Sequence, residues 1–520
     1  MPIVQQGSIN TTALVVPDLY VQIVPPQNLV LNGVPTNVLG IVGTASWGPM
    51  GQPVIGATMA DYARNFGPIM PRKHDMGTQM ATAVQQGAQN FRLVRVSDGT
   101  DAAAQSTLPG TTLVFTARHT GSLGNRIVLN LAPAARANSW RLTISMPGLA
   151  PEVFDNIAGT GNEFWSALAN AVNNGQGPRR GASQFVTMAH GGAILAPAAA
   201  SLTLGANIAG SDGAIFVATA QLIGSDITPR HGMYALRGQG ISLALLADAD
   251  DPAFWTTQAA FGLEEGAYMV LTGPAGDNVA NAVATKQTVG LDTHAAKLMF
   301  GDWLWWQDQV NAALRLVSPQ GFAAGRLANL SPEQSSLNKP LYGVIGSQKS
   351  GTPGSGQSAS YAAAELAVLL GAGIDVIANP QPAGAFWGVR GGHNASTNAA
   401  INGDNYTRLT NYIAATLAAG MGQYVGQLIS TDLFRRIRAT QLSFLQAMLS
   451  QGLLGSADGA LPFSVICDTS NNPASRTGLG YVQSDAQVQY QAINEKFIVN
   501  MEGGQTVQVA RQTLPAGQIS

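Results

Sequence analysis

The chain has 520 residues, of which 46% are apolar, so it is long enough to form several domains with ordinary hydrophobic cores. Only 11% of the residues are charged, against roughly 25% in a typical soluble domain. The net charge of −2 excludes a strong field for nucleic acid or an anionic membrane, and the single cysteine excludes an intrachain disulfide. A surface so poor in charge is typical of a subunit that is covered by neighbours in an assembly.

The N-terminus lacks the basic-then-apolar order of a signal peptide. No uncharged apolar run reaches the roughly 18 residues that a membrane-spanning helix needs. We therefore expect synthesis in the cytoplasm and no direct insertion into a membrane.

Residues 1–29 are predicted to form an extended N-terminal arm. Two short runs rich in β-branched residues, 13–16 and 20–24, are interrupted by Pro17, Pro25 and Pro26. Proline restricts a strand to the edge or the end of a sheet. Because no complementary run lies close in sequence, these strands are expected to pair elsewhere.

An α/β core is predicted for residues 30–108 and 196–372. Buried strands and amphipathic helices alternate in both parts, which is the rhythm of a layered α/β domain. The predicted strands are 37–43, 91–96, 241–247 and 267–271, and the predicted helices are 61–67, 77–89, 251–262, 278–290 and 361–370. Residues 346–356, rich in glycine and serine, are predicted to form a flexible linker.

Residues 109–195 are predicted to form a β-rich domain inserted into this core. Runs at 111–117, 126–131 and 140–145 have strand character, and the last alternates at period two. One helix is expected at 163–173.

A C-terminal α+β domain is predicted for residues 373–504. Its predicted strands are 374–377, 386–389, 463–467 and 489–501, and its two long helices are 405–420 and 431–452. Residues 505–511 alternate at period two after a pair of glycines, so 505–520 are predicted to form a second arm.

Motifs for common catalytic chemistry are missing from the sequence. The six histidines have no zinc-ligand spacing, and no phosphate-binding loop or nucleophile elbow occurs, so no cofactor is predicted. Asp248, Asp250 and Asp251 follow a predicted strand, where clustered carboxylates can hold magnesium. Asp251 also suits the N-cap of a helix beginning at Pro252, and we favour that interpretation. Cys467 follows an apolar strand and is interpreted as a core thiol.

Three arginines, Arg435, Arg436 and Arg438, fall in the first turns of the helix predicted at 431–452. Cations near a helix N-terminus oppose the helix dipole. Either the arginines form a solvated basic face, or an acidic partner surface compensates them. Local charge does not choose between the two.

Ordered motifs along most of the chain resemble those of contractile phage tail sheath proteins, a family that includes the sheaths of R-type pyocins and related injection systems. The matching segments are 16–23, 40–49, Phe66-Gly67, 121–126, 373–377, 386–390, 433–455, Cys467-Asp468 and 471–473. Departures include Asp18 in place of a glycine and Leu123 in place of a tryptophan, and the segment 109–195 matches least.

The resemblance implies a structural subunit, not an enzyme, that polymerises into stacked rings around a tail tube. Contraction would drive the tube through the host cell envelope. The resemblance also implies that terminal arms of neighbouring subunits complete the sheet of the C-terminal domain. The arm residues implicated are Leu14, Val16, Tyr20, Val21, Ile23, Val507 and Val509.

The implied partners are other copies of the chain, the tail tube protein, and baseplate and tail terminator proteins, within a virion assembled in the host cytoplasm. The resemblance maps the tube contact onto the helix 431–452, and so onto Arg435, Arg436 and Arg438. Alternative hypotheses are another self-assembling virion protein, such as a tube or capsid subunit, and a magnesium-dependent α/β enzyme.

Overall fold

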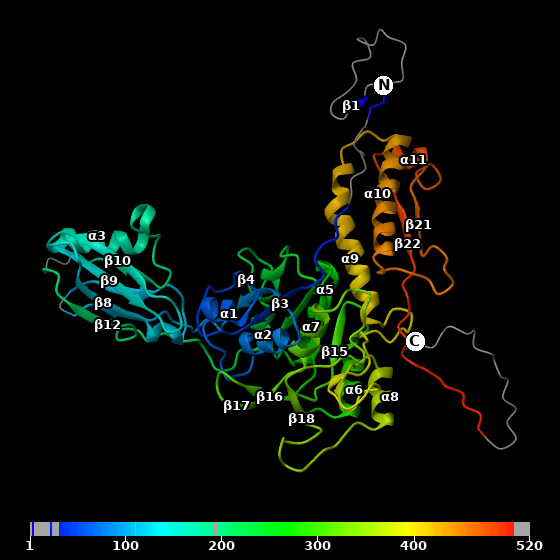
Figure 1. Cartoon of the computed structure of the whole chain (residues 1–520), viewed down its shortest axis with the longest axis horizontal. Helices are drawn as coiled ribbons and strands as arrows, with labels where there is room; N and C mark the ends of the chain where they lie inside the picture. The colour runs from blue at the N-terminus through cyan, green and yellow to red at the C-terminus, as the bar shows by residue number, and fades with distance from the viewer. Residues whose placement is uncertain (1–2, 5–20, 23–30, 110, 192–194, 504–520) are drawn as a thin grey trace, which may run out of the picture.

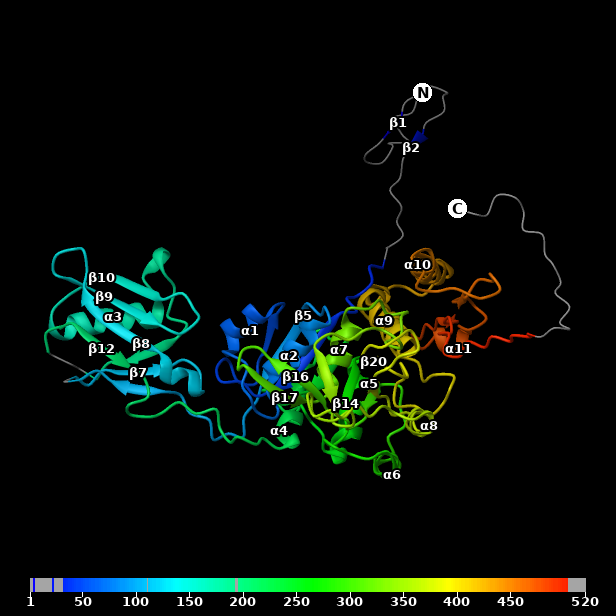
Figure 2. The same cartoon turned by 60° about the horizontal axis from the view of Figure 1, so that its bottom comes forward.

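The computed structural model describes residues 3–4, 21–22, 31–109, 111–191 and 195–503. A core domain lies in the middle, an inserted domain projects from one side of it, and a helical C-terminal domain stands on the other side (Figure 1). The inserted domain also stands apart from the rest when the molecule is turned (Figure 2). The mixed α/β architecture agrees with the predicted fold class.

The core domain is built on one six-stranded sheet. Its order is β15-β14-β13-β3-β5-β4, and only β4 is antiparallel to its neighbour. The strands are β3 (Val38–Gly43), β4 (Pro53–Gly56), β5 (Asn90–Arg95), β13 (Leu243–Leu246), β14 (Tyr268–Thr272) and β15 (Ala296–Met299). The parallel strands therefore follow the doubly wound order 2-1-3-4-5, which reverses direction between β3 and β13.

Helices cover both faces of this sheet because its strands are apolar on both sides. Leu39 and Ile41 of β3 face one cluster, whereas Val38 and Val42 face the other. The first cluster includes residues of α1 (Met59–Phe66), α2 (Met76–Gln85) and α7 (Gln320–Ala328). The second includes residues of α4 (Thr219–Ile223), α5 (Trp255–Glu265), α6 (Val279–Val289) and α8 (Ala363–Gly371).

Two small antiparallel sheets extend the core. The first is β17-β16-β18 and contains the aromatic run around Trp305 and Trp306. Its strands are β16 (Leu304–Asp308), β17 (Ala313–Val317) and β18 (Val344–Ser347), and the second sheet pairs β19 (Ile377–Ala378) with β20 (Gly388–Val389). β18 thus ends inside the segment 346–356 that was predicted as a flexible linker.

The inserted domain contains two antiparallel sheets and one long helix around its own hydrophobic cluster. One sheet is β6 (Gln105–Thr107), β7 (Val114–Ala117) and β11 (Val186–Ala189), and the other is β8 (Val128–Pro133), β9 (Ser139–Ser145), β10 (Glu152–Ala158) and β12 (Ala200–Thr203). The helix is α3 (Gly161–Asn174). β6 and β12 lie just outside the limits of 109 and 195 taken from the sequence.

Polar contacts fasten the inserted domain to the core at its base. The carboxylate of Asp212 accepts hydrogen bonds from Arg72 Nη1 at 2.9 Å and from the backbone N–H of Ser122 at 2.6 Å. Arg95, which is fully buried, donates to the carbonyls of Gly48 at 2.9 Å and Thr120 at 2.8 Å. The turn that the sequence comparison singled out at 121–126 therefore lies at this junction. Gly121 has φ of 129°, and a Cβ there would lie 2.1 Å from a backbone oxygen, so only glycine fits.

The C-terminal domain pairs two long helices, α9 (Asp404–Met421) and α10 (Thr431–Ser450), with a two-stranded antiparallel sheet of β21 (Phe463–Ile466) and β22 (Asp485–Val488). A short helix, α11 (Ala474–Thr477), lies between the strands in sequence. The cluster that joins them includes Ile413, Phe444 and Phe463 together with Leu31, so the chain just after the N-terminal arm packs into this domain.

Candidate assembly surfaces

The basic residues of α10 lie on one exposed face of the helix. Ser430 caps the helix, its side chain accepting a hydrogen bond from the N–H of Leu433 at 3.1 Å. Arg435, Arg436 and Arg438 are exposed, while Leu433, Phe434 and Ile437 between them are buried. The sequence therefore placed all three arginines correctly on one helix, and the structure brings them together on its solvent side.

Part of the compensating charge comes from the helix itself. Asp432 lies 3.1 Å from Arg436 Nε and 4.0 Å from Arg435 Nη2, with all three side chains largely in solvent. Exposed pairs of this kind contribute little, about 0–1 kcal/mol. The basic face is thus only lightly neutralised, and it remains available to an acidic surface.

Two large apolar side chains stand beside this basic face in the loop that joins α9 to α10. Val425 is 85% exposed and Leu428 is 91% exposed. The loop is held against α10 by a hydrogen bond of 2.8 Å from Arg436 Nη2 to Gln427 Oε1. Sequence reasoning missed these two residues. No local signal separates them from Tyr424 and Ile429 of the same loop, which pack against a hydrophobic cluster beneath α10.

The sheet of the C-terminal domain has room for further strands. Among the described residues β21 and β22 pair only with each other, so each has an unpaired outer edge. The inward-facing Phe463 and Val465 are buried, yet Ala486, opposite Val465 in the register, is exposed. An isolated two-stranded sheet is marginally stable at best. Cys467, just after β21, is 2% exposed, and burial raises the pKa of its thiol, as expected for a core cysteine.

The strand predicted at 489–501 is wrong for the isolated subunit. β22 ends at Val488, and residues 489–503 form no regular element. Phe497, Ile498, Val499 and Met501 are 69–88% exposed. These side chains have strand-forming character, but the subunit offers them no partner strand and no core.

The predicted arm residues Leu14, Val16, Tyr20, Ile23, Val507 and Val509 lie outside the described residues. Val21 belongs to β2 (Val21–Gln22), which pairs in parallel with β1 (Ile3–Val4).

Asp248, Asp250 and Asp251, which the sequence offered as a magnesium site, each bind a different partner. Asp248 is buried and accepts hydrogen bonds from Gln79 Nε2 at 2.8 Å and from the N–H of His74 at 3.1 Å. Asp250 forms an ion pair with Lys73 at 2.8 Å. Asp251 caps the 3₁₀ turn Pro252–Phe254 through Ala253 N–H, which confirms the favoured interpretation.

The strand order of the core sheet reverses between β3 and β13, and such folds usually bind their ligands in the crevice at that point. Here side chains of the protein fill this crevice. Gln79 and Gln320 reach across it and bond to Asp248 and to backbone groups. Within the described residues, no group of three or more His, Cys, Asp and Glu side chains gathers as a metal site, and no helix is long and apolar enough to cross a bilayer.

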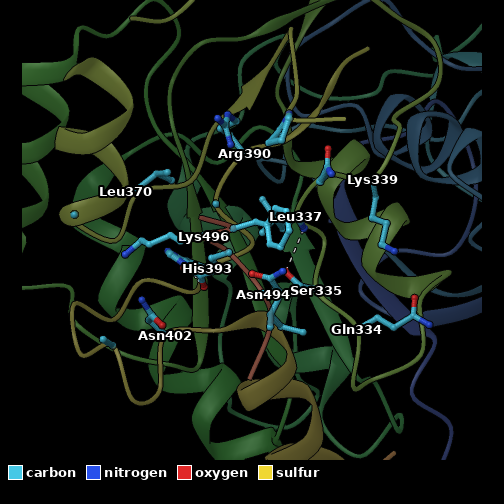
Figure 3. A pocket seen from close by; sticks show the side chains of 18 of the residues that line it. Gln334, Ser335, Leu337, Lys339, Leu370, Arg390, His393, Asn402, Asn494 and Lys496 are labelled. Carbon is cyan, nitrogen blue, oxygen red and sulfur yellow. Dashed lines mark hydrogen bonds and ion pairs between the residues drawn. The ribbon is translucent and has the colours of Figure 1, made fainter. Parts of the chain in front are cut away.

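A groove of about 1240 Å³ separates the C-terminal segment from the core. Figure 3 shows Lys496 and His393 on one side of it and Lys339 and Gln334 on the other. Residues 493–497 form part of its lining, and His393 Nε2 lies 2.8 Å from Glu495 Oε1. The groove was not anticipated from the sequence, because it joins segments more than 150 residues apart.

No protein-family model matches the chain, and no curated protein matches it by sequence. Solved structures do match. The sheath tail protein from Desulfitobacterium hafniense aligns with a TM-score of 0.56 and 17% identity over 85% of this chain and 92% of that one. The sheath tail protein Lin1278 from Listeria innocua aligns with a TM-score of 0.59 and 15% identity over 85% and 90%.

The sheath of an extracellular contractile injection system, PVC, in its contracted state aligns with a TM-score of 0.53 and 12% identity over 95% of this chain and 99% of that one. The structural neighbours are thus sheath proteins, which confirms the resemblance found in the sequence at the level of fold.

Proposed function

We propose that this chain is the subunit of a contractile tail sheath, which polymerises around a tail tube and contracts to drive the tube through a host cell envelope. The observation that carries the proposal is the sheath fold itself, shared over 85–95% of the chain with three sheath structures. Two of these are sheath tail proteins and the third is the sheath of an extracellular contractile injection system, which supports a location in a tail or a similar particle.

Strand exchange between copies is the proposed means of assembly. The two unpaired edges of β21–β22 and the exposed inner face at Ala486 support it, because an added strand would satisfy backbone groups and cover this face. The donors would be the arm residues Leu14, Val16, Tyr20, Val21, Ile23, Val507 and Val509. Head-to-tail contacts of this kind build open helical arrays.

The proposed tube contact is the face of α10 that carries Arg435, Arg436 and Arg438, flanked by Val425 and Leu428. Arginine suits such contacts because its planar group binds carboxylates in a fork and is weakly hydrated. The tube surface that faces it would carry carboxylates around an apolar patch. Baseplate and terminator proteins are the proposed partners at the two ends of the polymer, with assembly in the host cytoplasm.

Negative-stain microscopy of the purified full chain tests this proposal. We expect hollow tubular polymers, alone or on addition of the cognate tube protein. A monodisperse small oligomer under both conditions would overturn it. Sedimentation at several protein concentrations separates slow polymerisation from its absence.

A further inference from the structure

The C-terminal strap, residues 492–495, is loosely seated on the subunit. The residues just before the strap are anchored: the N–H of Gln489 donates to Pro462 O at 2.7 Å, and Asn405 Nδ2 donates to Gln491 O at 3.0 Å. Tyr490 between them packs against the hydrophobic cluster of the C-terminal domain. The groove of about 1240 Å³ and two cavities of about 490 and 450 Å³ adjoin it. A segment with so much unfilled space around it gives up few contacts when it leaves.

The far end of the strap is held by one side-chain contact. Glu495 Oε1 lies 2.8 Å from His393 Nε2, and the His393 side chain is only 12% exposed, against 36% for Glu495. Every residue from 496 to 503 is exposed. The His393–Glu495 contact therefore marks the point at which the chain leaves the body of the subunit.

The backbone of His393 is held in place by hydrogen bonds to a buried ion pair. Its N–H donates to Asp375 Oδ2 at 3.0 Å, and its carbonyl accepts from Lys297 Nζ at 2.9 Å. Lys297 and Asp375 are 0% and 1% exposed and are themselves paired at 2.7 Å. One side of the contact is thus anchored in the core, while the other side belongs to a loosely packed segment.

We propose that His393 and Glu495 form a latch that sets the length of chain available for exchange with a neighbouring copy. With the latch closed, the free segment begins at Lys496. With the latch open, it begins at residue 492, just after the anchored Tyr490 and Gln491. The four released residues extend the reach by at most roughly 13–14 Å, at about 3.3–3.6 Å per residue. The inference rests on the proposed function, and it adds an adjustable reach that a sliding subunit lattice can use.

Limited trypsin digestion of the unassembled full chain tests the latch. Lys496 is the only lysine or arginine between Arg476 and Arg511, so cleavage there has its own fragment masses. Cleavage of a transiently opened segment follows the population of the open form. Losing one hydrogen bond shifts such an equilibrium by about fivefold. We expect His393→Ala to speed cleavage after Lys496 by about fivefold, with the cleavage-site sequence itself unchanged.

Two further variants complete the experiment. His393→Phe removes the contact but keeps a ring of similar size, and it should also cleave about fivefold faster. His231→Ala alters an exposed histidine on the core domain and should cleave at the wild-type rate. Unchanged cleavage in both His393 variants, or equal acceleration in the His231 variant, would overturn the latch. The digestion uses unassembled subunits, so its outcome does not depend on whether the chain forms tubes. The microscopy in turn tests the proposed function and does not depend on the latch.

Discussion

Lys297 and Asp404 form a completely buried ion pair, with Nζ and Oδ1 3.0 Å apart, between β15 of the core sheet and the first residue of α9. Asp375 pairs with the same Nζ at 2.7 Å, and the phenol of Tyr268 donates to Asp404 Oδ1 at 2.7 Å. Burial opposes these charges, but the two carboxylates raise the pKa of Lys297 above its usual value. Together, these groups fix the C-terminal domain to the core.

Lys297→Met should lower the free energy of unfolding by about 3–5 kcal/mol, because it leaves two carboxylates buried without their cation. Lys349→Met is the matched control. It breaks an ion pair of 2.7 Å with Glu365, but both side chains are about a third exposed, so the loss should stay below about 1 kcal/mol. Urea denaturation of both variants measures the difference. Equal losses would contradict the role given to the buried pair.

Asp75 should make the subunit less stable as the pH rises. Burial raises the pKa of this N-cap carboxyl to about 7, against 3.8 for an exposed aspartate. The protonated form therefore contributes stability that is fully present below about pH 4 and is lost as the pH rises through 7. A pKa difference of that size is worth roughly 4 kcal/mol.

Asp75→Asn keeps an acceptor for the N–H of Thr78, now 2.7 Å from Asp75 Oδ2, but carries no titrating proton. The stability of the variant relative to the wild type should increase between pH 4 and pH 7, by up to roughly 4 kcal/mol. Chemical denaturation at several pH values measures it. A constant difference across this range would contradict the prediction.

Reversing charge on α10 should weaken assembly on tubes without unfolding the subunit. Arg435→Glu, Arg436→Glu and Arg438→Glu alter exposed side chains, so each should change stability by less than about 0.5 kcal/mol. Co-sedimentation with the tube protein should fall at least tenfold for the triple variant. Arg230→Glu, at an exposed site on the core, is the control. Normal sedimentation of the triple variant would exclude this face as the tube contact.

Removing residues 505–520 should abolish tubular polymers and leave the unfolding transition of the subunit in place. The reason is that the described cores of all three domains end before residue 491. Thermal unfolding and microscopy of the same preparation measure the two properties. Intact tubes from the truncated chain would show that strand exchange does not need this arm.

Much of the core could be predicted from the sequence because its strands are short, apolar and bounded by turns. The run at 37–43 predicted β3, and its burial on both faces follows from flanking helices. α7 was missed because its sequence has no amphipathic stripe. Gly321 and Gly325 pack against α2 so closely that a Cβ would lie 2.1 and 2.4 Å from Thr82 and Ala83. A helix that is buried on nearly every side has no polar face, so its sequence lacks the hydrophobic period by which helices are recognised.

The candidate assembly surfaces were predicted from the sequence only where a local pattern defined them. Arg435, Arg436 and Arg438 lie on the expected face because a helical period fixes their direction. The strand expected at 489–501 failed for the opposite reason. Strand propensity reflects how well side chains pack against a neighbouring strand, and the isolated subunit supplies no such strand. The groove beside His393 forms only when segments far apart in the sequence fold together, so no local sequence pattern predicts it.

The way the inserted domain is fastened has a practical consequence. Two chain crossings and a compact set of bonds around Asp212 and Arg95 hold it at its base. Apart from Trp47, the described residues of its hydrophobic cluster all lie between 103 and 204. A foreign module with closely spaced termini, grafted above that base, should fold without disturbing the rest of the subunit. In a helical array every copy would then display the graft at a fixed spacing, which makes this domain a natural point for engineering multivalent particles.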